Sequence, residues 1–196
     1  MQKKAGSRVR RIGAVLMGSA LVAAAGCQVP GTATTAPSPP VLDPDTPPSA
    51  TPPWSLSELY NHPCTVLGPE DLTRFGITGP GGPNLDFGPS YCRWGPPHTA
   101  VDGLRMYFAA NIFDRFSYLE EVKRDEEGFR TLDIAGRPTF LIDDRHATGH
   151  RNCMIWVQAA SGGLFQTEYV PRPTAPGDDV CDPAIEITTV IAERIR

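Results

Sequence analysis

The chain has 196 residues, of which 40% are hydrophobic and 20% are charged. This length suits one globular domain with additional segments rather than several domains. The 22 acidic residues outnumber the 18 basic ones, and the net charge of −4 argues against a nucleic-acid-binding protein, because such proteins present a basic surface.

The first 26 residues have the pattern of an export signal. Five basic residues, all within residues 3–11, precede the uncharged apolar run IGAVLMGSALVAAAG at residues 12–26. This run is shorter than the ~20 apolar residues that a membrane-spanning helix needs. We therefore expect residues 1–26 to be a signal peptide that is removed from the mature protein.

A cysteine follows the apolar run directly. The stretch Ala24-Ala-Gly-Cys27 resembles the lipobox of bacterial lipoproteins, with Ala24 where that family usually has leucine. The resemblance implies cleavage before Cys27, acylation of its thiol with chains such as palmitate, and extracytoplasmic anchoring to the cell membrane. An ordinary signal peptide with an unmodified Cys27 is the alternative, and the export route is left open.

Residues 27–53 differ in composition from the remainder of the chain. They hold nine of the 21 prolines and no aromatic residue, so they cannot bury enough apolar surface to fold, and we expect an extended, disordered tether that also suits O-glycosylation. Loss of the leader would leave 13 basic and 22 acidic residues, a net charge of −9. Membrane attachment would therefore depend on acyl chains at Cys27 and not on anionic lipid headgroups.

Residues 54–196 have the composition of one globular domain. A capping box at residues 55–58, and Pro69 with two acidic residues after it, predict two short helices. Alternating apolar residues in SYCRWG and GLRMYFAA, at residues 90–95 and 103–110, predict a strand hairpin. Apolar residues at helical spacing over 112–122 then predict an amphipathic helix.

The last third of the chain adds further strands and one helix. Strands are predicted from FRTLD, TFLID, NCMIWVQAA and GLFQTEYV, and the last two are expected to form a hairpin through SGG. A closing helix is predicted with Asp182 as its N-cap, Pro183 at its first position and an apolar stripe that ends at Ile195. These elements predict an α+β domain, in which helices pack on one face of an antiparallel sheet.

Four cysteines remain after Cys27. An even number in an exported chain predicts two disulfides, with three possible connectivities. We favour Cys64–Cys92 and Cys153–Cys181, because they close loops of similar length and because Cys181 begins the closing helix beside the hairpin that Cys153 opens. The sequence leaves the other two connectivities open.

Several motifs together resemble one family. They are HPCTVLGPEDL, YCRWG, IAGRPTF, CMIWVQ and VCDPAIEITTVIAERI, which span residues 60–195 and include all four cysteines in order. They are similar to the actinobacterial lipoprotein domain catalogued as domain of unknown function 3558. The resemblance implies a lipid-anchored envelope protein of a high-GC Gram-positive organism, plausible for mycobacteria, and implies no known reaction.

One short stretch has residue types that bind metals. DDRHATGHRNC, at residues 143–153, contains His146, His150 and Cys153 after two aspartates. The alternative is a polar turn in which Cys153 is oxidised to a disulfide and cannot act as a thiolate ligand. Because the spacing matches no established zinc pattern, we expect no metal here, and His146 and His150 are only weak candidates.

The sequence contains no motif for nucleophilic catalysis or phosphate binding, so we expect neither an enzyme nor a bound cofactor. We expect a binding or interaction module whose partner is a small molecule, a lipid or an envelope protein. The alternatives are an envelope hydrolase that uses His146 or His150 and a weak metal-binding protein. The oligomeric state is left open.

Overall fold

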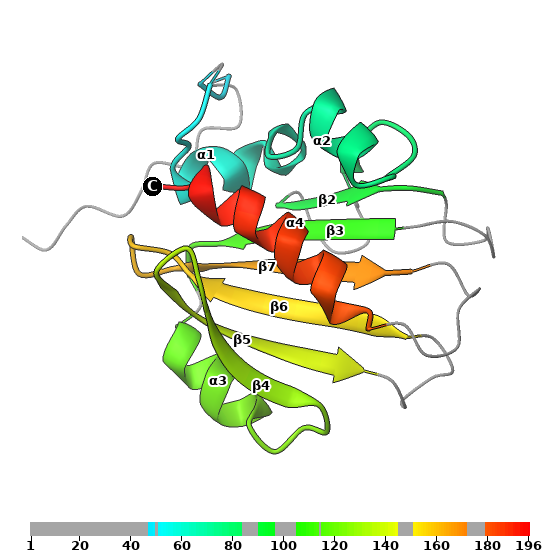
Figure 1. Cartoon of the computed structure of the whole chain (residues 1–196). Coiled ribbons are helices and arrows are strands. Elements are labelled where there is room, and N and C mark those ends of the chain that lie inside the picture. Colours follow the sequence, from blue (N-terminus) through cyan, green and yellow to red (C-terminus); the bar gives the residue numbers. More distant parts are fainter. Residues whose placement is uncertain are drawn as a thin grey trace, which may run out of the picture. The chain divides into compact units, whose positions relative to one another are not determined.

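A seven-stranded antiparallel sheet forms the centre of the folded chain (Figure 1). The computed structural model describes residues 47–49, 51–83, 90–96, 105–113, 115–144, 151–171 and 179–196, all within one unit that runs from Pro39 to Arg196. The predicted signal peptide, Cys27, most of the predicted tether, and both His146 and His150 lie outside the described residues. No helix in the described ranges is long and apolar enough to cross a membrane.

The strands follow the order β1-β2-β3-β7-β6-β5-β4. Their bounds are β1 Gly82–Pro83, β2 Tyr91–Trp94, β3 Arg105–Asn111, β4 Phe129–Ile134, β5 Arg137–Asp144, β6 Asn152–Gln158 and β7 Leu164–Val170. The two predicted hairpins are present, since β2 pairs with β3 and β6 pairs with β7. The pairing of β3 with β7 joins the two halves of the sheet.

Four α-helices and one 3-10 helix flank this sheet. Their bounds are α1 Leu56–Asn61, η1 Pro63–Thr65, α2 Pro69–Arg74, α3 Phe116–Lys123 and α4 Cys181–Glu193. The capping box of α1 is formed, with Ser55 Oγ accepting from Glu58 N at 3.2 Å and Ser55 N donating to Glu58 Oε2 at 2.7 Å. The predicted N-cap of α4, Asp182, is two residues late, because Val180 is the N-cap and the helix begins at Cys181, whose N–H donates to Asp179 Oδ1 at 2.9 Å.

The expectation that the helices share one face of the sheet is not confirmed. Helix α4 packs with Leu141 and Ile155 in the main core, whereas Phe116 of α3 packs with Phe140 and Trp156 in a second cluster. Neighbouring residues of a strand point to opposite faces, so α3 and α4 lie on opposite sides of β5 and β6. The physical reason is that β5 has buried side chains on both of its faces, so other elements must pack on each face.

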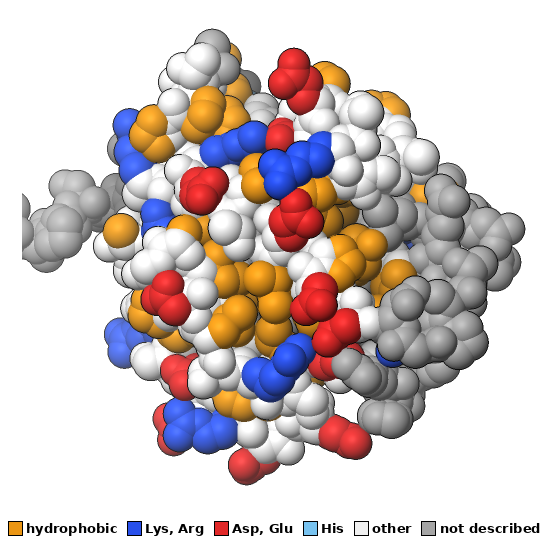
Figure 2. Space-filling model, in the orientation of Figure 1, with side chains coloured by type: hydrophobic (Ala, Val, Ile, Leu, Met, Phe, Trp, Pro, Cys, Tyr) orange, Lys and Arg blue, Asp and Glu red, His pale blue; other side chains and the backbone are white. Residues whose placement is uncertain are grey.

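Two disulfides fasten helices to the sheet. Cys64–Cys92 joins η1 to β2 with a Cα–Cα distance of 5.1 Å, and Cys153–Cys181 joins β6 to the first residue of α4 at 5.2 Å. This is the connectivity favoured from the sequence. Figure 2 shows the α4 face, on which acidic and basic side chains surround an apolar area beside α4. The half-buried Leu132 and Ile185 pack against the main core.

Candidate functional site

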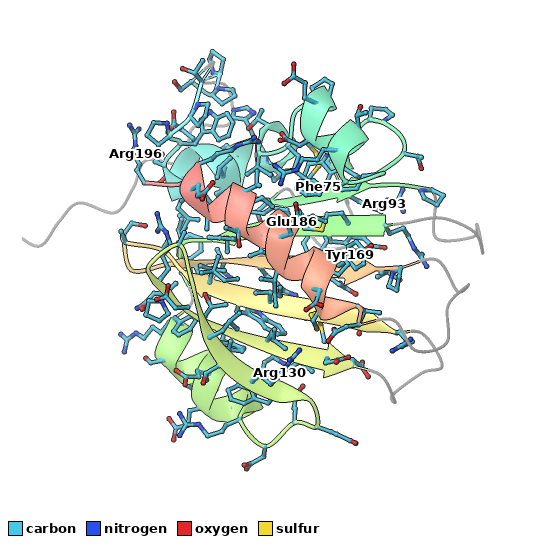
Figure 3. All side chains as sticks on the ribbon, viewed as in Figure 1. Phe75, Arg93, Arg130, Tyr169, Glu186 and Arg196 are labelled. Carbon is cyan, nitrogen blue, oxygen red and sulfur yellow. A yellow bond between two sulfur atoms is a disulfide. The ribbon has the colours of Figure 1, made fainter. Side chains whose placement is uncertain are left out.

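Polar side chains gather on the face of the sheet that carries α3, over strands β2, β3, β7 and β6. The register places Arg93, Tyr107 and Glu168 in one row, because Arg93 pairs with Tyr107 and Tyr107 pairs with Glu168. Arg93 is labelled in Figure 3. Tyr91 and Arg105 point to the same face, since each lies two residues from a member of that row. We call Tyr91, Arg93, Arg105, Tyr107, Asn152 and Glu168 the Glu168 cluster.

The carboxylate of Glu168 is the centre of this cluster. Its Oε2 accepts from Tyr91 Oη at 3.4 Å, and its Oε1 accepts from Asn152 Nδ2 at 3.1 Å. The rings of Tyr91 and Tyr107 lie beside each other, with centroids 5.7 Å apart and planes inclined at 50°. Glu168 therefore connects strands β2, β7 and β6 through side chains rather than through the backbone ladder.

Burial raises the pKa of both tyrosines of the cluster. Burial, and after it the negative charge of Glu168, hold the pKa of Tyr91 well above its ordinary value. Burial also raises the pKa of Tyr107, with Glu168 adding to the effect and Arg105 and Arg93 opposing it. Both phenols therefore keep their protons at neutral pH, and each can donate a hydrogen bond.

Two buried atoms of the cluster have no hydrogen-bond partner among the residues that the structure describes. They are Arg105 Nε, a donor, and Asn152 Oδ1, an acceptor. Arg105 of β3 pairs with Val170 of β7. Because Cys153 of β6 pairs with Tyr169, Asn152 lies beside Val170 on its other side. Arg105 and Asn152 are therefore two strand spacings apart, about 10 Å. Buried polar groups are normally bonded, and an unbonded one costs ~1–3 kcal/mol. The cluster thus contains one donor and one acceptor whose hydrogen bonds are unsatisfied within the described residues.

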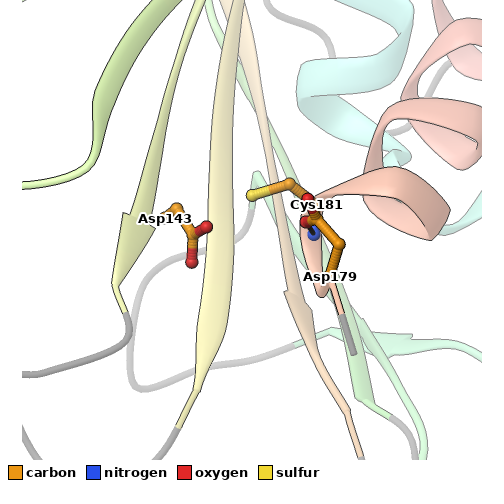
Figure 4. Close-up of side chains that lie close together, drawn as sticks. All are labelled: Asp143, Asp179 and Cys181. Atoms are coloured by element: carbon orange, nitrogen blue, oxygen red, sulfur yellow. Dashed lines mark hydrogen bonds between the residues drawn. The ribbon is translucent and has the colours of Figure 1, made fainter. Parts of the chain in front are cut away.

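Asp143, Asp179 and Cys181 form a second group, at the start of α4 (Figure 4). One potential ligand atom from each lies within 4.8 Å of the others. Cys181 is bonded to Cys153, and Asp143 pairs with Cys153 across β5 and β6. A sulfur in a disulfide is not a thiolate, so the oxidised protein offers only two carboxylates here, fewer than the ligands of a structural zinc site.

The sequence was compared with known families and proteins. A family model described as Protein of unknown function (DUF3558) matches residues 22–194. The chain belongs to the DUF3558 family. No curated protein and no solved structure gave a match to the chain. The resemblance expected from the cysteine motifs is thereby confirmed at the level of the family, whose description assigns no activity.

Sequence reasoning found only part of the candidate sites in this DUF3558 chain. It grouped Asp143 with Cys153, and the structure brings these two residues together; the two histidines of the same stretch lie outside the described residues. It missed the Glu168 cluster, because it singled out neither Glu168 nor Tyr91 as a candidate site residue. A signal was available, since Tyr91, Arg93, Arg105, Tyr107 and Glu168 occupy alternate positions of three strands.

Proposed function

We propose that this DUF3558 protein is an extracytoplasmic, lipid-anchored binding module of the actinobacterial cell envelope, and that it binds a small polar molecule at the Glu168 cluster. The leader, the lipobox-like stretch before Cys27 and the proline-rich segment support export, acylation and a tether. The family match supports a shared domain and leaves the ligand to be inferred from the site.

The observation that carries the binding proposal is the pair of unbonded buried atoms, Arg105 Nε and Asn152 Oδ1. A ligand with hydroxyl or amide groups could accept from the first atom and donate to the second. The hydroxyl oxygen of Tyr91 and the carboxylate of Glu168, which bond to each other, retain lone pairs that could accept from a ligand. We infer binding rather than turnover, because the sequence has no catalytic motif and Glu168 is held by two neighbours.

A protein partner is the second candidate, and exposed apolar side chains favour it. Tyr118 and Val122 are 63% and 57% exposed and lie one turn apart on α3. Such neighbours form a small apolar surface that a partner could cover. We place this candidate second, because an exposed pair of this kind is common on soluble domains.

Native mass spectrometry of the full chain, exported by an actinobacterial host, tests the binding proposal. We expect a reproducible added mass in the wild-type protein. Tyr91→Phe removes a hydroxyl that donates to a carboxylate, so it should weaken retention of that mass about tenfold, for a hydrogen bond of ~1.5 kcal/mol. The control is Tyr118→Phe, which removes an exposed hydroxyl and should change nothing. A bare chain mass in all three proteins would contradict the proposal and favour the protein partner.

A further inference from the structure

A cavity of about 500 Å³ lies at the opposite end of the strands from Asn152 and Asp144. It is lined by residues 135–138 at the turn between β4 and β5, and by residues 158–160 with Gly162 at the turn between β6 and β7. Asn152 and Gln158 are the first and last residues of β6, so the cavity is about 20 Å from Asn152 along the strand, and about 13 Å from the level of Met154, which pairs with Glu168. Its volume lies within the range of small-molecule sites.

Small residues keep both turns open. A side chain added at Gly136 or at Gly162 would meet nothing within 4 Å. Ala135 and Gly136 both have positive φ angles, 52° and 75°, as the central residues of a tight two-residue hairpin turn require. Gly136 N donates to Asp133 Oδ1 at 2.8 Å, which fixes this turn. The cavity walls are therefore formed mostly by backbone and methyl groups on fixed turns.

Arg137 brings a positive charge to this cavity. The guanidinium is half-buried and forms no ion pair with any carboxylate of the described residues. Its Nη2 donates to the carbonyl oxygen of Ile195, beyond the end of α4, while its Nη1 is buried and has no hydrogen-bond partner in the described part of the chain. A half-buried cation that lacks an anionic partner is unfavourable, and a bound anion would satisfy both its charge and its free donor.

We propose that this cavity binds a small anionic ligand, with a carboxylate or phosphate group held by Arg137. The planar guanidinium of Arg137, which is one of the lining residues, suits the oxygen pairs of both groups. The overall acidic charge does not favour general attraction of anions, so binding would depend on this local site. The proposal does not rest on membrane anchoring or on the Glu168 cluster.

Nuclear magnetic resonance titration of the full exported chain with inorganic phosphate, and separately with acetate, tests this site at constant ionic strength. We expect saturable shifts of backbone amides at residues 135–137 and 158–162. Saturation with phosphate alone assigns a phosphate site, saturation with acetate alone assigns a carboxylate site, and saturation with both assigns their shared chemistry. No saturable shift with either anion would overturn the proposal.

Variants distinguish anion binding in the cavity from a general effect of surface charge. Arg137→Gln should weaken binding at least tenfold, because it removes a charge-assisted bond. Arg130→Gln removes an equal charge from an exposed residue of β4 and should leave the affinity within twofold. Arg137 also holds the end of the chain, so Ala160→Trp is the second variant; it fills the cavity from an exposed turn and leaves the guanidinium in place. Saturable shifts that persist in Ala160→Trp would overturn the proposal, even if Arg137→Gln failed to fold.

Discussion

Asp71 and Arg194 join two segments that are far apart in the sequence. Arg194 Nη1 donates to Asp71 Oδ2 at 2.6 Å, and Nη2 donates to Asp71 Oδ1 at 2.7 Å. Nη1 also donates to the carbonyl oxygen of Val66 at 3.1 Å. Only 12% of the Asp71 side chain is exposed, so this bidentate pair is less screened by water than a surface pair. It fixes the end of α4 to the start of α2.

We expect Asp71→Asn to lower the free energy of unfolding by ~1–3 kcal/mol at pH 7, because it replaces a carboxylate that holds a half-buried guanidinium. The hydrogen bonds from Arg194 lower the pKa of Asp71. The pKa of Asp71 is therefore lower in the folded protein than in the unfolded protein. The stabilisation is complete at pH values above the ordinary aspartate pKa, and it disappears as the pH falls through the pKa of the folded state. In urea unfolding, the difference in the free energy of unfolding between wild type and variant should disappear below about pH 4.

The exposed pair of Arg74 and Glu186 is the matched control for this experiment. Its N–O distance is also 2.6 Å, but its side chains are 58% and 57% exposed. Glu186→Gln should change the free energy of unfolding by less than about 0.5 kcal/mol. The importance assigned to burial would be contradicted if both variants lost the same free energy of unfolding. It would also be contradicted if the loss for Asp71→Asn stayed constant from pH 7 to pH 3.

At the scale of elements, the first residue of α4 is held by a covalent bond to β6. Cys153–Cys181 and Cys64–Cys92 have the same sequence separation of 28 residues. Loop-closure entropy therefore predicts equal stabilisation from the two bonds, about 3–4 kcal/mol each. They differ in what they fasten, since only Cys153–Cys181 anchors a helix that packs across the main core.

Replacing each cysteine pair by alanines separates these two effects. Both double variants, Cys153→Ala with Cys181→Ala and Cys64→Ala with Cys92→Ala, should lose similar amounts of stability in chemical unfolding. Native-state hydrogen exchange should differ, with faster exchange at the first turns of α4 only in the variant that lacks Cys153–Cys181. Equal exchange of α4 in the two variants would show that packing alone holds the helix.

Local patterns predicted the elements better than their arrangement. The capping box of α1, both hairpins and the apolar stripe of α4 depend on residues close in sequence, and the structure contains them. The side of the sheet that α3 covers depends on β5 being buried on both faces, which the three-residue apolar run at residues 140–142 does not distinguish from a one-sided strand. The Glu168 cluster requires β3 to pair with β7, and that pairing is decided by tertiary packing.

At the scale of the whole molecule, the described domain and the N-terminal segment have different tasks in our proposal. Residues 1–26, the proposed leader, carry five basic residues, and the chain from residue 27 onward has a net charge of −9. An acidic domain is not attracted to anionic lipids, so anchoring would require the acyl chains proposed for Cys27. The proline-rich segment would then hold the domain away from the bilayer.

Cys27→Ala tests this division of tasks. The variant should leave the membrane fraction and accumulate as a slower-migrating precursor, because cleavage of a lipoprotein leader requires the modified cysteine. Cell fractionation with immunoblotting measures both effects, and Cys27→Ser provides a second variant that also lacks the thiol. Unchanged fractionation of both variants would contradict lipid anchoring without affecting the binding proposal.

The most direct test of the central claim, that the Glu168 cluster binds a small polar molecule, is an electron-density map of the protein exported by an actinobacterial host. Arg105 Nε and Asn152 Oδ1 are the two atoms to inspect. We predict density larger than a water molecule that bonds to at least one of them and contacts Tyr91 or Glu168. Density for single waters alone at both atoms would contradict the claim, because the cluster would then be a hydrated structural network.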